Sequence, residues 1–173
     1  PAMNAAEKPG NRETLLAHAY AIENEAAERY QDLADQMYAC NNTEVGDLFA
    51  KLAEIEAKHA AELSLEHGAA RTPMAAADYA WGNLESPEAI PFGEMHYLIQ
   101  PHQALTLALA AEERALAFYT DVVNQAPTDD LRNLAEEFVL EEAEHVALVR
   151  EWLQRYPEPE HDWDTDDDPP VQP

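Results

Sequence analysis

The chain has 173 residues, which is enough for one domain with a sizeable core and too few for two full domains. Its 35 acidic and 10 basic residues give a formal net charge of -25, and a surface of that sign repels nucleic acid and anionic membranes. Glycine is scarce, and the turn-bounded runs of Val, Ile and Thr that are typical of strands are absent. The composition therefore predicts an all-α protein.

The cysteine content excludes some redox centres, and the hydropathy bears on where in the cell the protein is expected. The one cysteine, Cys40, excludes an internal disulfide and a four-cysteine iron centre within this chain. No apolar run is long enough to span a bilayer and no secretory signal opens the sequence, so we expect a cytoplasmic protein.

The first part of the chain predicts two helices joined by a tight turn. Apolar residues at helical spacing extend from about Asn11, a suitable N-cap, to about Cys40. A second helical pattern extends from about Thr43 to His67, and Gly68 follows it as a typical C-terminal cap.

Two more helices are predicted in the second part. The third extends from about Pro101, a first-turn proline, to Gln125. Thr128 caps the fourth, which reaches about Arg155.

The connections between these helices predict the topology. Short turns make two antiparallel hairpins, and residues 68–100 form a long crossover between them, rich enough in apolar residues to pack on the bundle. We therefore predict a four-helix bundle domain over residues 11–156. Residues 157–173 are rich in Pro and Asp and predict a disordered acidic tail.

The two predicted hairpins repeat each other in sequence. The pattern E-x-x-A-x-x-x-Y occurs from Glu23 to Tyr30 and again from Glu112 to Tyr119. The pattern E-A-x-H then follows in each hairpin, and its two copies begin at Glu56 and Glu142 and end at His59 and His145. Two matches in the same order carry far more weight than one Glu-x-x-His pair.

All six polar residues of these motifs fall on the apolar stripes of their helices, so they face the bundle interior. A buried carboxylate without a partner costs several kcal/mol or takes up a proton, and the stripes contain almost no Lys or Arg. Two divalent cations would balance the four carboxylates, and two imidazoles would complete the ligands. The predicted metal ligands are Glu23, Glu56, His59, Glu112, Glu142 and His145.

Several neighbouring residues have more than one interpretation. Glu141 also lies near the core face of the fourth helix, although the repeat favours Glu142 as the ligand. Tyr30 and Tyr119 are expected to pack in the core and hydrogen-bond to ligands, with a redox role as the alternative. The histidines outside the motifs are expected at the surface or at helix ends; they are His18, His67, His96 and His102.

On these motifs the chain resembles the ferritin-like superfamily, and within it the rubrerythrin-type and bacterioferritin-type proteins. The resemblance covers residues 11–155. It implies that Glu56 and Glu142 are the carboxylates that precede the ligand histidines, and that Glu23 and Glu112 come from the partner helices. It also implies a carboxylate-bridged di-iron centre that reacts with dioxygen or hydrogen peroxide.

The chain departs from both kinds of relative. Rubrerythrins carry a rubredoxin domain with four cysteines, and they have an additional glutamate three residues after the third-helix ligand, where this chain has Ala115. Bacterioferritins bind haem through a methionine directly after the second-helix ligand glutamate. This chain has Ala57 there, so we expect no haem.

The function we expect is that of a rubrerythrin-like oxidoreductase, of peroxidase or ferroxidase type, in oxidative stress or iron handling. Two iron ions would react with peroxide or dioxygen, and an external electron donor would reduce them again. Manganese and zinc are alternative ions for the same ligands. The family resemblance also implies a homodimer.

Three other functions use the same ligands. A di-iron oxygenase acting on an organic substrate would need an apolar channel beside the metals. An iron-binding or storage protein without turnover would need a cage or a mineral cavity, and a structural bundle would hold a non-redox metal. The fold by itself does not choose among them.

Overall fold

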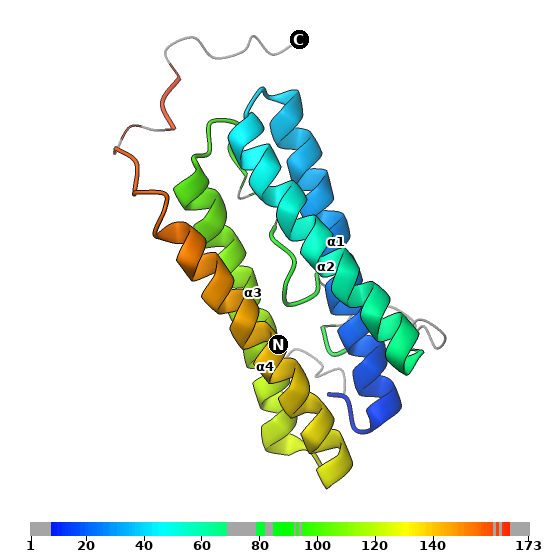
Figure 1. Cartoon of the computed structure of the whole chain (residues 1–173). Coiled ribbons are helices and arrows are strands. Elements are labelled where there is room, and N and C mark those ends of the chain that lie inside the picture. The colour runs from blue at the N-terminus through cyan, green and yellow to red at the C-terminus, as the bar shows by residue number, and fades with distance from the viewer. Residues whose placement is uncertain are drawn as a thin grey trace, which may run out of the picture.

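The structure, a computed structural model, describes residues 8–68, 79–81, 85–91, 93, 95–160, 162 and 164–166. Four long helices form the predicted all-α bundle, and the described residues contain no strand (Figure 1). The helices are α1 (Arg12–Ala39), α2 (Thr43–His67), α3 (Pro101–Gln125) and α4 (Asp129–Leu153). In the described part of the chain, no helix combines the length and the apolar character needed to cross a membrane.

The helix ends follow their capping residues. The Asn11 side chain accepts a hydrogen bond from the Thr14 amide at 2.9 Å, and the Thr14 hydroxyl accepts one from the Asn11 amide, which together form a capping box. Gly68 ends α2 with a left-handed φ of 64°. The Thr128 hydroxyl accepts a hydrogen bond from a first-turn amide of α4. The predicted bounds are confirmed to within two residues at every helix end.

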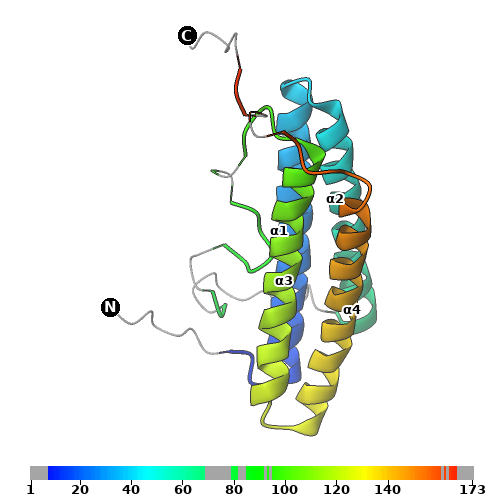
Figure 2. The ribbon, with the colours of Figure 1, turned by 90° about the vertical axis from the view of Figure 1, so that its left-hand side faces the viewer.

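The helices are arranged as two antiparallel hairpins, α1–α2 and α3–α4. The turn between α1 and α2 contains Asn41 with a positive φ of 58°, and the Asn42 side chain donates to the Ile99 carbonyl at 2.7 Å. The chain between α2 and α3 crosses from one hairpin to the other, and Figure 2 shows its described part beside α1 and α3. This is the predicted ferritin-like topology.

The core consists of two apolar clusters with a polar layer between them. One cluster lies toward the α1–α2 turn and includes Phe49. The other lies toward the α3–α4 turn and includes Phe138. On α3, Ala111 belongs to the first cluster and Ala115 to the second, and the buried Glu112 lies between them. The helices therefore place carboxylates in a layer that apolar side chains cover at both ends.

The chain beyond α4 is described only in part. Its described residues form no helix, and one of them, Asp166, accepts a hydrogen bond from the Tyr97 hydroxyl of the crossover at 2.6 Å. Several residues of the crossover and of the segment 157–173 lie outside the described residues. The domain bounds and the disorder of this tail stay predictions.

Candidate metal centre

The polar layer brings together the six residues that the motifs predict, from all four helices. Five of them are more than nine-tenths buried, and the sixth, His59, has 26% of its side chain exposed. Their ligand atoms belong to three overlapping groups in which the atoms lie within 4.8 Å of one another. The residues are Glu23 on α1, Glu56 and His59 on α2, Glu112 on α3, and Glu142 and His145 on α4.

His145 lies at the centre of the carboxylates. Its Nδ1 atom is 3.4 Å from Glu112 Oε2, 3.6 Å from Glu142 Oε2 and 3.8 Å from Glu56 Oε1. These carboxylates belong to three different helices. One imidazole nitrogen therefore contacts groups that only the tertiary fold brings together.

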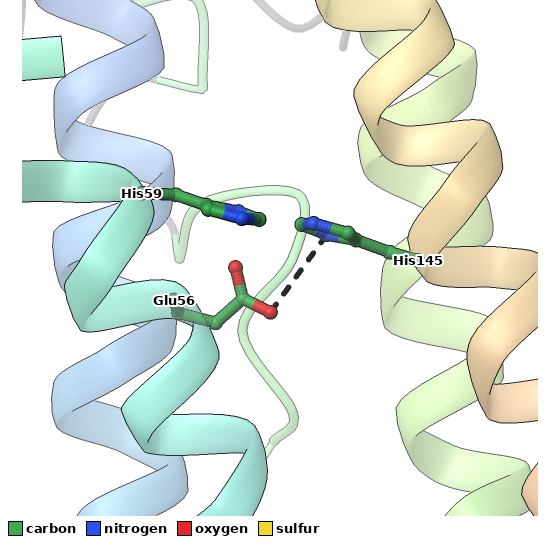
Figure 3. Close-up of side chains that lie close together, drawn as sticks. All are labelled: Glu56, His59 and His145. Atoms are coloured by element: carbon green, nitrogen blue, oxygen red, sulfur yellow. Dashed lines mark ion pairs between the residues drawn. The ribbon is translucent and has the colours of Figure 1, made fainter. Parts of the chain in front are cut away.

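The two predicted histidines face each other across the layer, as Figure 3 shows. Their ring centroids are 4.6 Å apart and the rings are nearly parallel, with an interplanar angle of 14°. Glu56 lies beside both rings, and His59 Nδ1 is 3.8 Å from Glu23 Oε2. The Glu-x-x-His spacing places Glu56 and His59 on one face of α2, so both can reach one ion.

The structure adds a residue that the sequence interpretation missed. Glu88 of the crossover has no exposed surface and belongs to two of the groups of close ligand atoms. One of these groups also holds Glu56, Glu112 and His145, and the other holds Glu23 and Glu142. The crossover has no helical periodicity to show which side chains point inward, so its sequence gave no signal beyond one acid among small and apolar neighbours.

Burial raises the pKa of several carboxyl groups in the layer well above the ordinary value, and the charges of neighbouring carboxylates add to the shift. These groups are Glu23, Glu56, Glu88 and Glu142. Without a cation, such carboxyls hold protons at a pH where exposed ones have lost them. The layer is therefore an unfavourable place for free carboxylates.

The two histidines shift in opposite directions. Burial disfavours the charged form of His145, but its contact with Glu112 and the charges of Glu142, Glu112 and Glu23 outweigh this and raise the pKa to about 9. Burial and the charge of His145 lower the pKa of His59. In the layer the protonated form of His145 and the neutral form of His59 are thus favoured, and the neutral form is the one that binds a metal.

The donor atoms of the layer are of the kinds that bind metal ions. Each of the seven residues has at least one buried nitrogen or oxygen atom without a hydrogen-bond partner among the described residues. Buried polar atoms are normally hydrogen-bonded, and a cluster of exceptions at one place needs an explanation. Carboxylate oxygen and imidazole nitrogen are ligands for iron, manganese and zinc. The residues present are therefore chemically suited to hold metal of this kind.

The two motif tyrosines differ in their surroundings. The Tyr30 hydroxyl donates a hydrogen bond to Glu112 Oε1 at 3.1 Å, which confirms the expected contact with a predicted ligand. Tyr119 is equally buried and packs against Phe118 and Phe138, but its hydroxyl has no hydrogen-bond partner among the described residues.

The structure also separates Glu141 from Glu142. Glu142 is 1% exposed and points into the polar layer, whereas Glu141 is exposed on the surface of α4. The inward position of Glu142 therefore agrees with the sequence repeat, which favours Glu142 over Glu141 as the ligand.

The expectation for His18 was wrong. His18 is buried, because its ring packs against Tyr79 and Trp81 of the crossover. Its Nδ1 bonds the Thr14 carbonyl at 2.6 Å, and its Nε2 accepts from the Ala80 amide at 3.0 Å. The residues that bury it are distant in sequence, so helical spacing could not reveal them. His67, His96 and His102 are all partly exposed.

Comparisons with known proteins agree with this geometry. A family model described as Rubrerythrin matches residues 14–85. The crystal structure of an uncharacterised conserved protein from Magnetospirillum magnetotacticum MS-1 is similar, with 33% sequence identity and a TM-score of 0.66. That match covers 86% of this chain and 97% of the other. A search of curated proteins finds no match.

Proposed function

Because this chain belongs to the rubrerythrin family of ferritin-like proteins, we propose that it is a di-iron oxidoreductase that reacts with hydrogen peroxide or dioxygen. One observation supports the proposal most. The polar layer collects buried carboxylates and two histidines whose ligand atoms lack partners, and no Lys or Arg of the described residues is buried there to neutralise them. Two cations would offset most of that charge, and iron in such a centre supplies electrons and Lewis acidity.

The three groups of close ligand atoms suggest how the proposed ligands would divide between the two ions. Glu56, His59, Glu112 and His145 would hold one ion, because Glu56 and His145 belong both to the group with His59 and to the group with Glu112. Glu23 and Glu142, which share the remaining group, would hold the other.

Other residues of the chain orient these ligands and keep water out. Tyr30 fixes the Glu112 carboxylate through its hydrogen bond, and such a contact sets the direction in which a ligand points. The two apolar clusters close the layer at both ends. Exclusion of water strengthens each electrostatic interaction inside the layer.

His59 marks the side from which a small reactant would reach the centre. Its side chain is 26% exposed, whereas those of Glu56, Glu112, Glu142 and His145 are 8% exposed or less. This partial exposure favours small reactants such as peroxide and dioxygen. An organic substrate would need a larger opening.

The chain also implies an external electron donor. Its one cysteine, Cys40, is exposed, and a single cysteine cannot hold a four-cysteine iron centre that would pass electrons on. We therefore propose that an electron donor outside these 173 residues returns the electrons after each oxidation.

Elemental analysis tests the proposal directly. The wild-type protein and two variants are produced in iron-supplemented medium. Glu142→Ala removes a buried carboxylate of the polar layer, and the control Glu141→Ala removes the exposed carboxylate next to it. We expect about two irons per chain in the wild type and in Glu141→Ala, and about one or none in Glu142→Ala. The iron-loaded wild type should consume added hydrogen peroxide faster than Glu142→Ala does.

Three results would contradict the proposal. Wild-type protein without stoichiometric metal would refute the site. Stoichiometric zinc that iron cannot replace would refute the redox function. Iron-loaded protein that leaves both peroxide and dioxygen unchanged in the presence of a reductant would refute the reaction.

A further inference from the structure

Glu88 differs from the other buried carboxylates because it lies outside the helices. It is 0% exposed, and neither of its carboxylate oxygens has a hydrogen-bond partner among the described residues. An isolated ionised carboxylate is among the costliest groups to bury, so a side chain of this kind normally has a cation or a proton donor nearby. The described surroundings of Glu88 offer other carboxylates and His145 instead.

The position of Glu88 relates it to both halves of the polar layer. It is close to Glu56, Glu112 and His145 in one group of ligand atoms, and to Glu23 and Glu142 in another. Among the described residues it is the only one that these two groups share. A carboxylate has two oxygens and can contact one ion with each, so this position is suited to a bridging ligand.

Two arginines from different hairpins hold the backbone on both sides of Glu88. Arg114 of α3 donates from Nε to the Pro87 carbonyl at 2.8 Å and from a terminal nitrogen to the Ala89 carbonyl at 3.2 Å. Arg29 of α1 donates to the Ile90 carbonyl. Carbonyl groups before and after Glu88 are thereby fixed to the bundle, which leaves the Glu88 side chain directed inward.

A second glutamate of the same segment has a different environment. Glu85 is 46% exposed and accepts a hydrogen bond from Arg29 at 2.7 Å. The chain therefore neutralises Glu85 with an arginine at the surface and leaves Glu88 without one inside. This contrast indicates that the packing of the crossover does not by itself explain why Glu88 is buried.

We propose that Glu88 is a seventh ligand of the metal centre, supplied by the crossover, that it bridges the two ions, and that Arg29 and Arg114 position it. This inference rests on the proposed function. It adds to the six helical ligands a carboxylate that no helix motif encodes.

A fifth carboxylate changes the charge balance of the centre. With neutral imidazoles, five carboxylates exceed the charge of two divalent ions by one and fall short of two trivalent ions by one. Glu88 therefore favours the oxidised pair relative to a centre with four carboxylates. Replacing it with a neutral side chain should raise the reduction potential of the centre.

Metal binding by three variants tests the proposal. Glu88→Gln keeps the size of the side chain and removes its charge, Glu88→Asp keeps the charge and shortens the reach, and Glu85→Gln is the matched control. Metal-free proteins are dialysed against ferrous iron without oxygen, and thermal unfolding of the same metal-free samples is measured. We expect the affinity for the second ion to fall at least about tenfold in both Glu88 variants and to stay unchanged in Glu85→Gln.

The stability of the metal-free proteins shows whether Glu88 acts as a metal ligand or only packs in the core. Glu88→Gln should unfold at a temperature no lower than the wild type, because it replaces a buried carboxyl group that has no hydrogen-bond partner among the described residues with a neutral side chain of the same size. A clearly lower unfolding temperature would assign Glu88 to packing and overturn the proposal. Two ions bound by Glu88→Gln with wild-type affinity would overturn it as well.

Iron binding by the wild type distinguishes a failure of the proposed function from a failure of the role proposed for Glu88. Wild-type protein that binds two ferrous ions, together with a Glu88→Gln variant that binds them equally well, would refute only the role of Glu88. Wild-type protein that binds no ferrous iron would refute the proposed function and this inference with it.

Discussion

At the scale of single residues, the polar layer of the metal-free protein is energetically unfavourable. Five carboxyl groups lie within one buried layer, and for Glu23, Glu56, Glu88 and Glu142 burial and mutual repulsion both disfavour the charged form. A hydrogen bond from a neutral donor relieves part of this cost, and Tyr30 provides one to Glu112. Its counterpart Tyr119 provides none among the described residues.

This difference predicts unequal effects of two matched substitutions. Tyr30→Phe removes a hydrogen bond to a buried carboxylate and should destabilise the metal-free protein by about 1–3 kcal/mol. Tyr119→Phe removes a hydroxyl without a partner and should leave the stability unchanged or slightly raised. Urea unfolding of both metal-free variants measures the difference. Equal losses in the two variants would show that the contact with Glu112 contributes nothing.

At the scale of elements, the crossover does more than join the hairpins. Its residues 86 and 88–90 are buried, and arginines of α1 and α3 bind its carbonyl groups. Ile90 and Ile99 belong to the same apolar cluster as residues of all four helices. The crossover thereby connects the two hairpins beside the polar layer.

Removing one arginine should loosen this segment. Arg114→Met loses hydrogen bonds to the Pro87 and Ala89 carbonyls and should destabilise the local structure by about 1–3 kcal/mol. We expect faster amide hydrogen exchange over residues 85–91 and weaker iron binding, with the helices unchanged. Arg132→Met serves as the control, because Arg132 bonds Asp129 and Ala126 at the α3–α4 end. Unchanged exchange over residues 85–91 in Arg114→Met would contradict this prediction.

At the scale of the whole molecule, the polar layer couples folding to pH. The raised pKa values of the buried carboxyls mean that the folded metal-free protein holds protons that the unfolded chain has released. His145 acts in the same direction. Its stabilising contribution is complete below pH 6.5 and is lost as the pH rises through about 9. The lowered pKa values of His18 and His59 act in the opposite direction, but only below pH 6.5.

We therefore expect the metal-free protein to become less stable between pH 6.5 and about 9. Metal ions displace these protons, so metal affinity should increase over the same range. Thermal unfolding at both pH values, with and without bound iron, measures both effects. A metal-free protein that gains stability with rising pH would show that the layer is ionised without a metal.

The helices and six of the residues in the polar layer could be predicted from the sequence. Helical periodicity fixes the face on which a side chain lies, so Glu56 and His59 had to point the same way wherever α2 packed. The repetition of both motifs then showed that the two hairpins direct the same groups toward each other. Capping residues such as Asn11 and Gly68 are local, and they set the helix ends.

Only the tertiary structure decided the role of residues whose surroundings come from distant parts of the chain. Glu88 is turned inward because Arg29 and Arg114, which belong to different helices, hold the backbone around it. His18 is buried because crossover residues, with Tyr79 and Trp81, cover it. A regular helix carries its side-chain directions in its own period, whereas an irregular segment takes them from the contacts that it makes.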